Sequence, residues 1–210
     1  KNNQVTIVAG NINAAVFAEE FLQEGITDIV VRGEGEYAML DICRAIENQS
    51  SLKEIKGISY REGETIIHNG ARASQANLDE LPYPAHHLFN LDEYKSQVFF
   101  LRRGRYLPVS VSRGCSYNCV FCSNKITHDK FRFREPEGIV DEITFLHNRF
   151  GVRTIGLMGS YFPINRSHTE RFCDLMIEKG LHKKIRWFTE SRVDKVDNGL
   201  LKKMKKSGLY

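Results

Sequence analysis

The chain has 210 residues, of which 41% are hydrophobic and 27% are charged, and its formal net charge is +4. This composition is ordinary for a soluble globular protein of one large or two small domains, so it predicts no function by itself. No apolar run approaches the ~20 residues needed to cross a bilayer, and the first residues lack the layout of a signal peptide. We therefore expect a cytoplasmic protein without a membrane partner.

The first part of the chain has the pattern of an α/β domain. Apolar strands are expected at residues 5–10 and 29–31, and amphipathic helices at residues 14–24 and 38–46. Strand, helix, strand, loop and helix in this order predict an open parallel sheet. Two alternating segments between residues 57 and 68 flank Glu62-Gly63 and predict a hairpin that closes the domain.

A linker and a second α/β series are expected next. Two prolines in residues 81–85 disfavour helix, and we assign residues 79–106 to the linker. Strands are expected at residues 109–113, 154–158 and 186–190, and helices at residues 138–148, 169–179 and 198–206. Three such units are roughly three-eighths of a (β/α)₈ barrel by size, so we expect the chain to be a fragment cut at both ends.

Three of the five cysteines, Cys115, Cys119 and Cys122, lie within eight residues directly after the expected strand 109–113. Such spacing is unsuited to a disulfide framework and, in a reducing compartment, indicates metal binding or catalysis. A 4Fe-4S cluster needs thiolate ligands, and three cysteines in one loop can converge on three of its four irons. Cys43 and Cys173 fall on apolar faces of expected helices, which predicts that both are buried.

The cysteine segment, residues 113–123, reads RGCSYNCVFCS and closely resembles the signature of radical S-adenosylmethionine (SAM) enzymes. In that family the iron without a protein ligand chelates SAM, and one electron from the cluster cleaves SAM to a 5′-deoxyadenosyl radical while the protein orients the reactants. The resemblance implies that the three cysteines are the metal ligands and that Phe121 packs near the adenine. It also implies a small-molecule or peptide substrate and an electron donor such as flavodoxin or ferredoxin.

Residues after the next two expected strands extend the resemblance. Gly159 and Ser160 follow the strand 154–158, where the family often has a glycine-containing segment that contacts the methionyl group of SAM. A plain strand-to-helix turn is the alternative. Glu190 and Arg192 end the third strand, where polar residues of the family approach the SAM ribose or carboxylate. A structural ion pair at the barrel rim is the alternative for these two.

The segment 32–36 reads RGEGE and formally fits a dinucleotide-binding fingerprint. We reject that interpretation because two glutamates at a helix start would repel a pyrophosphate. Together with Ala9-Gly10 and the proline linker, the segment resembles the cobalamin (B12) domain that precedes one class of radical SAM cores. The resemblance implies a partial Rossmann-like domain over residues 1–78 and a partial TIM-like barrel over residues 107–210. It adds cobalamin as a cofactor and methyl transfer as the commonest activity, and places these residues at the cobalamin site: Gly33, Glu34, Gly35 and Glu36.

Two rival functions are weighed against this one. A tRNA methylthiotransferase carries cluster cysteines in its N-terminal domain, and here only Cys43 precedes the loop. A zinc-binding module could use His128 as a fourth ligand, but structural zinc sites pair their ligands in two separated groups. The lysine-rich end, residues 202–206, has no interleaved aromatic residues and is expected to be a solvated helix face, which disfavours a nucleic-acid partner.

Overall fold

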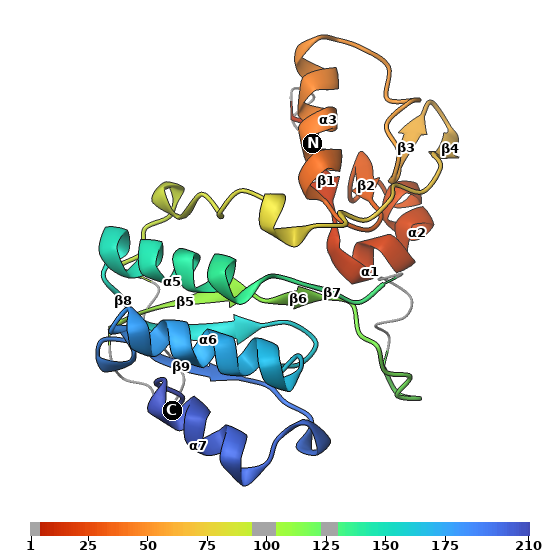
Figure 1. The fold of residues 1–210 in the computed structure, drawn as a ribbon. Coiled ribbons are helices and arrows are strands. Elements are labelled where there is room, and N and C mark those ends of the chain that lie inside the picture. Colours follow the sequence, from red (N-terminus) through yellow and green to blue (C-terminus); the bar gives the residue numbers. More distant parts are fainter. Residues whose placement is uncertain (1–4, 94–103, 123–129) are drawn as a thin grey trace. The chain divides into compact units, whose positions relative to one another are not determined.

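The computed structural model describes residues 5–93, 104–122 and 130–210, and the chain divides into two compact units on either side of Gln75 and Ala76 (Figure 1). Both units combine helices with sheets that contain parallel strands, which confirms the predicted α/β fold class. The functional assignments of residues 1–78, 79–106 and 107–210 stay predictions. In the described part of the chain, no helix is long and apolar enough to cross a membrane.

The sheet of the first unit has the order β1-β2-β3-β4, with β1 at Val8–Ala9, β2 at Ile29–Val31, β3 at Ile58–Glu62 and β4 at Thr65–His68. The pair β1-β2 is parallel, and the other two pairs are antiparallel. The predicted hairpin is confirmed as β3 and β4. The first strand is shorter than predicted, because only two of its residues pair with β2.

Helices cover both faces of this sheet because side chains alternate along β2. Ile29 and Val31 pack with α3 (Glu36–Glu47), whereas Val30 packs with α1 (Asn11–Val16) and α2 (Ala18–Gln23). The single helix predicted over residues 14–24 is wrong. Phe17 has φ −105° and ψ 37°, which interrupts the helical path between α1 and α2.

The two cysteines outside the loop behave differently. Cys173 is fully buried, as predicted, but Cys43 is exposed and that prediction is wrong. The buried residues of α3 are Ala38, Ile42 and Ala45. Cys43 follows Ile42 directly, so it is rotated by about 100° around the helix axis and faces solvent.

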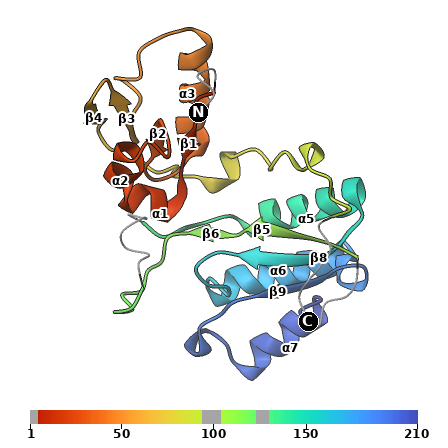
Figure 2. The ribbon, with the colours of Figure 1, turned by 180° about the vertical axis from the view of Figure 1, so that it is seen from behind.

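The second unit contains a parallel sheet with the order β5-β8-β9, formed by Arg105–Ser110, Val152–Met158 and Arg186–Thr189 (Figure 2). One helix comes after each of these strands in the chain: α5 (Pro136–Phe150) after β5, α6 (Arg166–Glu178) after β8 and α7 (Asn198–Lys206) after β9. α6 packs between α5 and α7 (Figure 1). Their apolar faces and the sheet form one continuous core that includes Trp187 and Phe172, both fully buried. Strand followed by helix is thus the repeating element of this unit.

The single strand predicted at residues 109–113 is instead two strands with different partners. β5 ends at Ser110, and β6 (Ser112–Arg113) pairs antiparallel with β7 (Arg132–Phe133). Val111 lies at the change of partner: its amide donates to Met158 on one side, and its carbonyl accepts from the Arg134 amide on the other. The chain therefore leaves the main sheet just before the cysteines.

Part of the predicted linker packs on the second unit. Short 3-10 helices form in or next to this linker at η1 (Leu78–Glu80) and η2 (His86–Leu88). Two others, η3 (Leu181–Lys183) and η4 (Val193–Lys195), flank β9 instead. Leu78 and Leu91 are buried, and the Asp79 carboxylate accepts from the Glu135 amide at 2.8 Å. Residues 94–103 of the predicted linker lie outside the described residues.

Candidate functional site

The cysteine loop, residues 114–122, begins where β6 ends. Its start lies at the edge of the β5-β8-β9 sheet that carries the carboxyl ends of the strands, because the Val111 amide bonds to Met158, the last residue of β8, at 2.7 Å. Segments that follow β8 and β9 leave the sheet at this same edge. In βα barrels the active site lies at the carboxyl ends of the strands.

Gly114 sets the direction of the loop. Its φ is +75°, and a Cβ at this position would overlap the carbonyl oxygen of Lys130. Only glycine adopts this conformation without strain and leaves room for the neighbouring backbone. The Gly114 carbonyl in turn accepts a hydrogen bond from Ser160 Oγ at 2.5 Å. The residue before Cys115 is therefore fixed by the segment that follows β8.

The three loop cysteines are free thiols. Cys115 and Cys119 are half-buried, Cys122 is exposed, and the Cys122 amide donates to the Cys119 carbonyl at 3.1 Å. Among the described residues, no three His, Cys, Asp or Glu side chains are already arranged to hold a metal ion. His128, the fourth zinc ligand considered above, lies outside them. The donor set in the loop is thus three sulfurs, which suits an iron-sulfur cluster that keeps one iron free of protein.

Aromatic and hydroxyl contacts join the loop to Tyr161, which is buried just after β8. Ser116 Oγ lies 3.0 Å from the Tyr161 hydroxyl, and the rings of Tyr117 and Tyr161 meet edge to face at 5.4 Å between centroids. Phe131 stacks on the Tyr161 ring, with 5.1 Å between the ring centroids. Edge-to-face and offset pairs of this kind stabilise a fixed geometry, so Tyr161 anchors the middle of the loop.

Arg192, after β9, makes the third connection to the loop. Its guanidinium lies 3.8 Å from the centroid of the Tyr117 ring, and its Nη1 lies 3.8 Å from the sulfur of Cys119. Its Nε and Nη2 donate to the two carboxylate oxygens of Asp194 at 3.0 and 3.2 Å. These hydrogen bonds raise the pKa of Arg192 and lower the pKa of Asp194. A permanent positive charge is therefore held beside a candidate ligand sulfur.

The other predicted SAM contacts differ in what surrounds them. Phe121 presents a ring that is 89% exposed, and the Glu190 side chain is exposed while its carbonyl accepts from the Phe162 amide. A Cβ on Gly159 would overlap Ser112 Oγ, so this glycine permits a close approach of two chain segments. Ser112 is buried, and its hydroxyl has no hydrogen-bond partner within the described ranges. No pattern in the sequence predicts this unpartnered hydroxyl of Ser112 next to the loop.

The segment Gly33 to Glu36 lies in the first unit, between β2 and the first turn of α3. Gly33 has φ +100°, and Glu34 Oε2 accepts from the Gln75 amide at 2.9 Å. Arg32, just before it, donates to the Ile58 carbonyl at 3.1 Å. This acidic loop is thus held by contacts within its own unit.

A family model settles the assignment of the second unit. The model of the radical SAM superfamily matches residues 109–210, a range that includes the cysteine loop and the segments after β8 and β9. Residues 109–210 form a radical SAM domain. This finding confirms the resemblance read from the RGCSYNCVFCS segment.

Curated relatives of this radical SAM chain extend beyond it. An uncharacterized methyltransferase of Pyrococcus horikoshii is 30% identical over 100% of this chain and 44% of its own length. The anaerobic magnesium-protoporphyrin IX monomethyl ester cyclase of Cereibacter sphaeroides is 31% identical over 96% of this chain and 33% of its own. The chain thus spans less than half the length of either relative.

Solved structures share the fold across both units. TsrM of Kitasatospora setae, a radical SAM methyltransferase with cobalamin and a 4Fe-4S cluster bound, covers 98% of this chain with a TM-score of 0.75 at 16% identity. OxsB, a cobalamin-dependent radical SAM enzyme, covers 96% with a TM-score of 0.75 at 21% identity. This chain covers 41% of the TsrM chain and 30% of the OxsB chain.

Proposed function

We propose that the chain is part of a cobalamin-dependent radical SAM methyltransferase of the cytoplasm. The observation that carries the proposal is a loop with three free cysteines, pinned at the carboxyl ends of parallel strands by Ser160, Tyr161 and Arg192. The bound 4Fe-4S cluster would supply the electron that cleaves SAM to a 5′-deoxyadenosyl radical. A reducing compartment suits three free thiols that must serve as ligands.

Cys115, Cys119 and Cys122 would hold the cluster. Their thiols share one short loop, and the turn closed between the Cys122 amide and the Cys119 carbonyl brings the last two close together. Gly114 fixes the start of the loop and Tyr161 anchors its middle, so the three ligands could converge on a cluster while the loop stays attached to the sheet. Three protein sulfurs leave one iron free for the amino and carboxylate groups of SAM.

Five residues are proposed to contact or position SAM. The exposed Phe121 ring offers a surface for the adenine, and the exposed Glu190 carboxylate can accept hydrogen bonds from ribose hydroxyls. Arg192 offers a guanidinium for a carboxylate, a geometry suited to paired hydrogen bonds. Gly159 has no side chain, so the segment after β8 can lie close to Ser112 at the start of the loop. Ser160 acts as a positioning residue through its bond to the Gly114 carbonyl.

The first unit would contribute to cobalamin binding through Gly33, Glu34, Gly35 and Glu36. The support is the fold shared with TsrM and OxsB over both units and the methyltransferase name of the Pyrococcus relative. In this proposal residues 1–78 belong to the cobalamin domain, 79–106 to the linker and 107–210 to the barrel. The substrate is a small molecule or a peptide, and the electron donor is a flavodoxin or ferredoxin.

One relative favours a second reaction type. The Cereibacter enzyme is named a monomethyl ester cyclase, so ring closure by the same radical chemistry is the alternative to methyl transfer. A relative in Methanocaldococcus jannaschii is named a putative methylthiotransferase at 27% identity. Among residues 1–114 only Cys43 is a cysteine, so the stretch before the loop in this sequence holds no second set of cluster cysteines of the kind that methylthiotransferases carry in their N-terminal domain.

The test is anaerobic reconstitution of the protein with iron and sulfide, followed by SAM and dithionite. We expect a broad brown absorption and formation of 5′-deoxyadenosine, both lost in Cys119→Ala. Cys43→Ala is the matched control, because it also removes one exposed or half-buried thiol but lies outside the loop. Equal 5′-deoxyadenosine from wild type and Cys119→Ala would defeat the proposal. Co-purification of a corrin with its characteristic visible spectrum tests the cobalamin part separately.

A further inference from the structure

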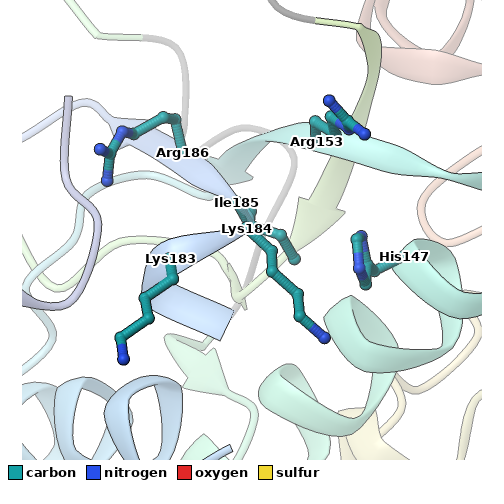
Figure 3. A pocket seen from close by; sticks show the side chains of 6 residues that line it. All are labelled: His147, Arg153, Lys183, Lys184, Ile185 and Arg186. Atoms are coloured by element: carbon teal, nitrogen blue, oxygen red, sulfur yellow. The ribbon is translucent and has the colours of Figure 1, made fainter. Parts of the chain in front are cut away.

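A hollow of about 430 Å³ lies at the end of the second unit opposite the cysteine loop. It is lined by the last turn of α5, the start of β8 and the segment from the end of η3 to the start of β9, namely His147, Arg153, Lys183, Lys184, Ile185 and Arg186 (Figure 3). These residues stand at the amino ends of β8 and β9, whereas the loop follows the carboxyl ends. Seven residues of β8 separate the two ends by about 20 Å.

The lining is strongly basic. Four of its six side chains are cations, one is a histidine and none is a carboxylate. His147 Nδ1 bonds to the Val152 carbonyl at 2.9 Å, and Arg186 Nη1 donates to the His182 carbonyl at 3.2 Å, so these contacts neutralise no charge. Within the described part of the chain, Arg153, Lys183 and Lys184 have no carboxylate partner.

Several cations elsewhere on this unit are paired with carboxylates. Four cations on or directly after α6 and on α7 each form an ion pair with a carboxylate, namely Arg166, Arg171, Lys179 and Lys203. These four helix cations are each balanced by a carboxylate, whereas the cations of the hollow are not balanced by any carboxylate that the structure describes. Four cations around one concave volume raise the local potential and attract anions, which focuses a negative ligand there.

We propose that this hollow binds a small polyanion that carries at least two phosphate groups. Arg153 stands on β8 and the other three cations stand on residues 183–186, with their charged ends spread around the hollow, so we expect more than one anionic group to be needed to contact them all. A guanidinium on each strand offers paired donors to phosphate oxygens. Figure 3 shows Arg153 and Arg186 on neighbouring strands and Lys184 extending from the segment before β9. The volume falls within the usual range of ligand pockets. Among the residues that the structure describes, no Phe, Tyr or Trp lines the hollow, so the recognition proposed here rests on charge.

Titration calorimetry with inorganic tripolyphosphate tests the proposal on the full chain. In Arg153→Gln/Lys184→Gln we expect the dissociation constant to rise about 10-fold, because each exposed ion pair contributes a factor of about 2 to 5. Lys56→Gln/Lys202→Gln is the matched control: it removes two exposed charges outside the hollow and should leave the dissociation constant within about 2-fold.

Two further measurements make the outcome decisive. Unliganded thermal midpoints of both double variants should equal that of the wild type, which separates lost binding from lost folding. Raising the salt from 50 to 200 mM should weaken binding to the wild type, since exposed charges are screened over about 10 Å or less. Equal tripolyphosphate affinity in wild type and Arg153→Gln/Lys184→Gln, or an equal loss in the control, would overturn the proposal. Neither result depends on cluster assembly or SAM cleavage.

Discussion

Replacing Arg134 with methionine is expected to destabilise the second unit strongly. The Arg134 side chain is 9% exposed and pairs with Glu142, which is 4% exposed, and its Nε donates to Asp79 at 2.9 Å. Its guanidinium also donates to the carbonyls of Ser110 and Gly138. Methionine keeps much of the aliphatic volume but leaves Glu142 without its cation.

The magnitude follows from which charge is left behind. Removing one partner of a buried ion pair costs about 3 to 5 kcal/mol, because the remaining charge stays away from water without compensation. We take about 3 kcal/mol as the expected loss in the free energy of unfolding, since Glu142 can shift and recruit water. The double variant Arg134→Met/Glu142→Leu should be less destabilised than Arg134→Met alone, because it leaves no buried charge on either partner.

Urea unfolding followed by tryptophan fluorescence measures this effect. Trp187 is the single tryptophan of the chain and is fully buried in the second unit, so its emission reports on that unit. A loss of about 3 kcal/mol corresponds to a fall in thermal midpoint of roughly 6 to 12 °C for a chain of this size. A change below about 1 kcal/mol in Arg134→Met, or a double variant less stable than either single variant, would refute the reasoning.

Four more outcomes follow from the contacts described above. Gly114→Ala should bind less iron after reconstitution with an unchanged circular dichroism spectrum, because alanine at φ +75° overlaps Lys130 and displaces the loop. Arg192→Met should weaken SAM binding about 10-fold at unchanged iron content, the loss expected for one charged hydrogen bond, and titration calorimetry with SAM checks it. Burial raises the pKa of the Cys173 thiol, so iodoacetamide at pH 8 should label Cys43 before Cys173 by mass spectrometry. For the same reason, the neutral Cys173 thiol contributes fully to the free energy of unfolding below the pKa of about 8.5 that it has in the unfolded chain. This contribution is lost as the pH rises through the higher pKa of the folded state, and urea unfolding at a series of pH values should show the loss.

Much of the fold could be predicted where local signals agree with tertiary packing. α7 was predicted at residues 198–206 and is observed there, since Asp197 caps its first amides and Gly208 at φ +110° follows its end. Local sequence patterns did not predict the structure where contacts between distant segments determine it. The break at Phe17 and the change of partner at Val111 depend on which segments pack alongside, and no proline or glycine lies within two residues of either position.

The candidate site divides in the same way. Parallel strands end at one edge, so placing Ser160 and Arg192 near the cysteines needed only the order of strands and helices. Their partners were not predictable. Ser160 bonds to a carbonyl 46 positions earlier in the chain, and Arg192 reaches Tyr117 and Cys119 across more than 70 positions. Contacts over such separations depend on the path of the loop, which no local pattern of residues specifies.

Arg134 links the stability of the second unit to the geometry of the loop. Its amide donates to the Val111 carbonyl at 2.9 Å, and its Nη1 donates to the Ser110 carbonyl at 3.2 Å, so it holds the residues at which the chain leaves the sheet toward the cysteines. Its own carbonyl accepts from His168 Nε2 at 2.8 Å. Iron loss in an Arg134 variant would therefore reflect a displaced strand end as well as a weaker fold. Iron loss in Cys119→Ala, with stability equal to that of Cys43→Ala, would isolate the ligand itself.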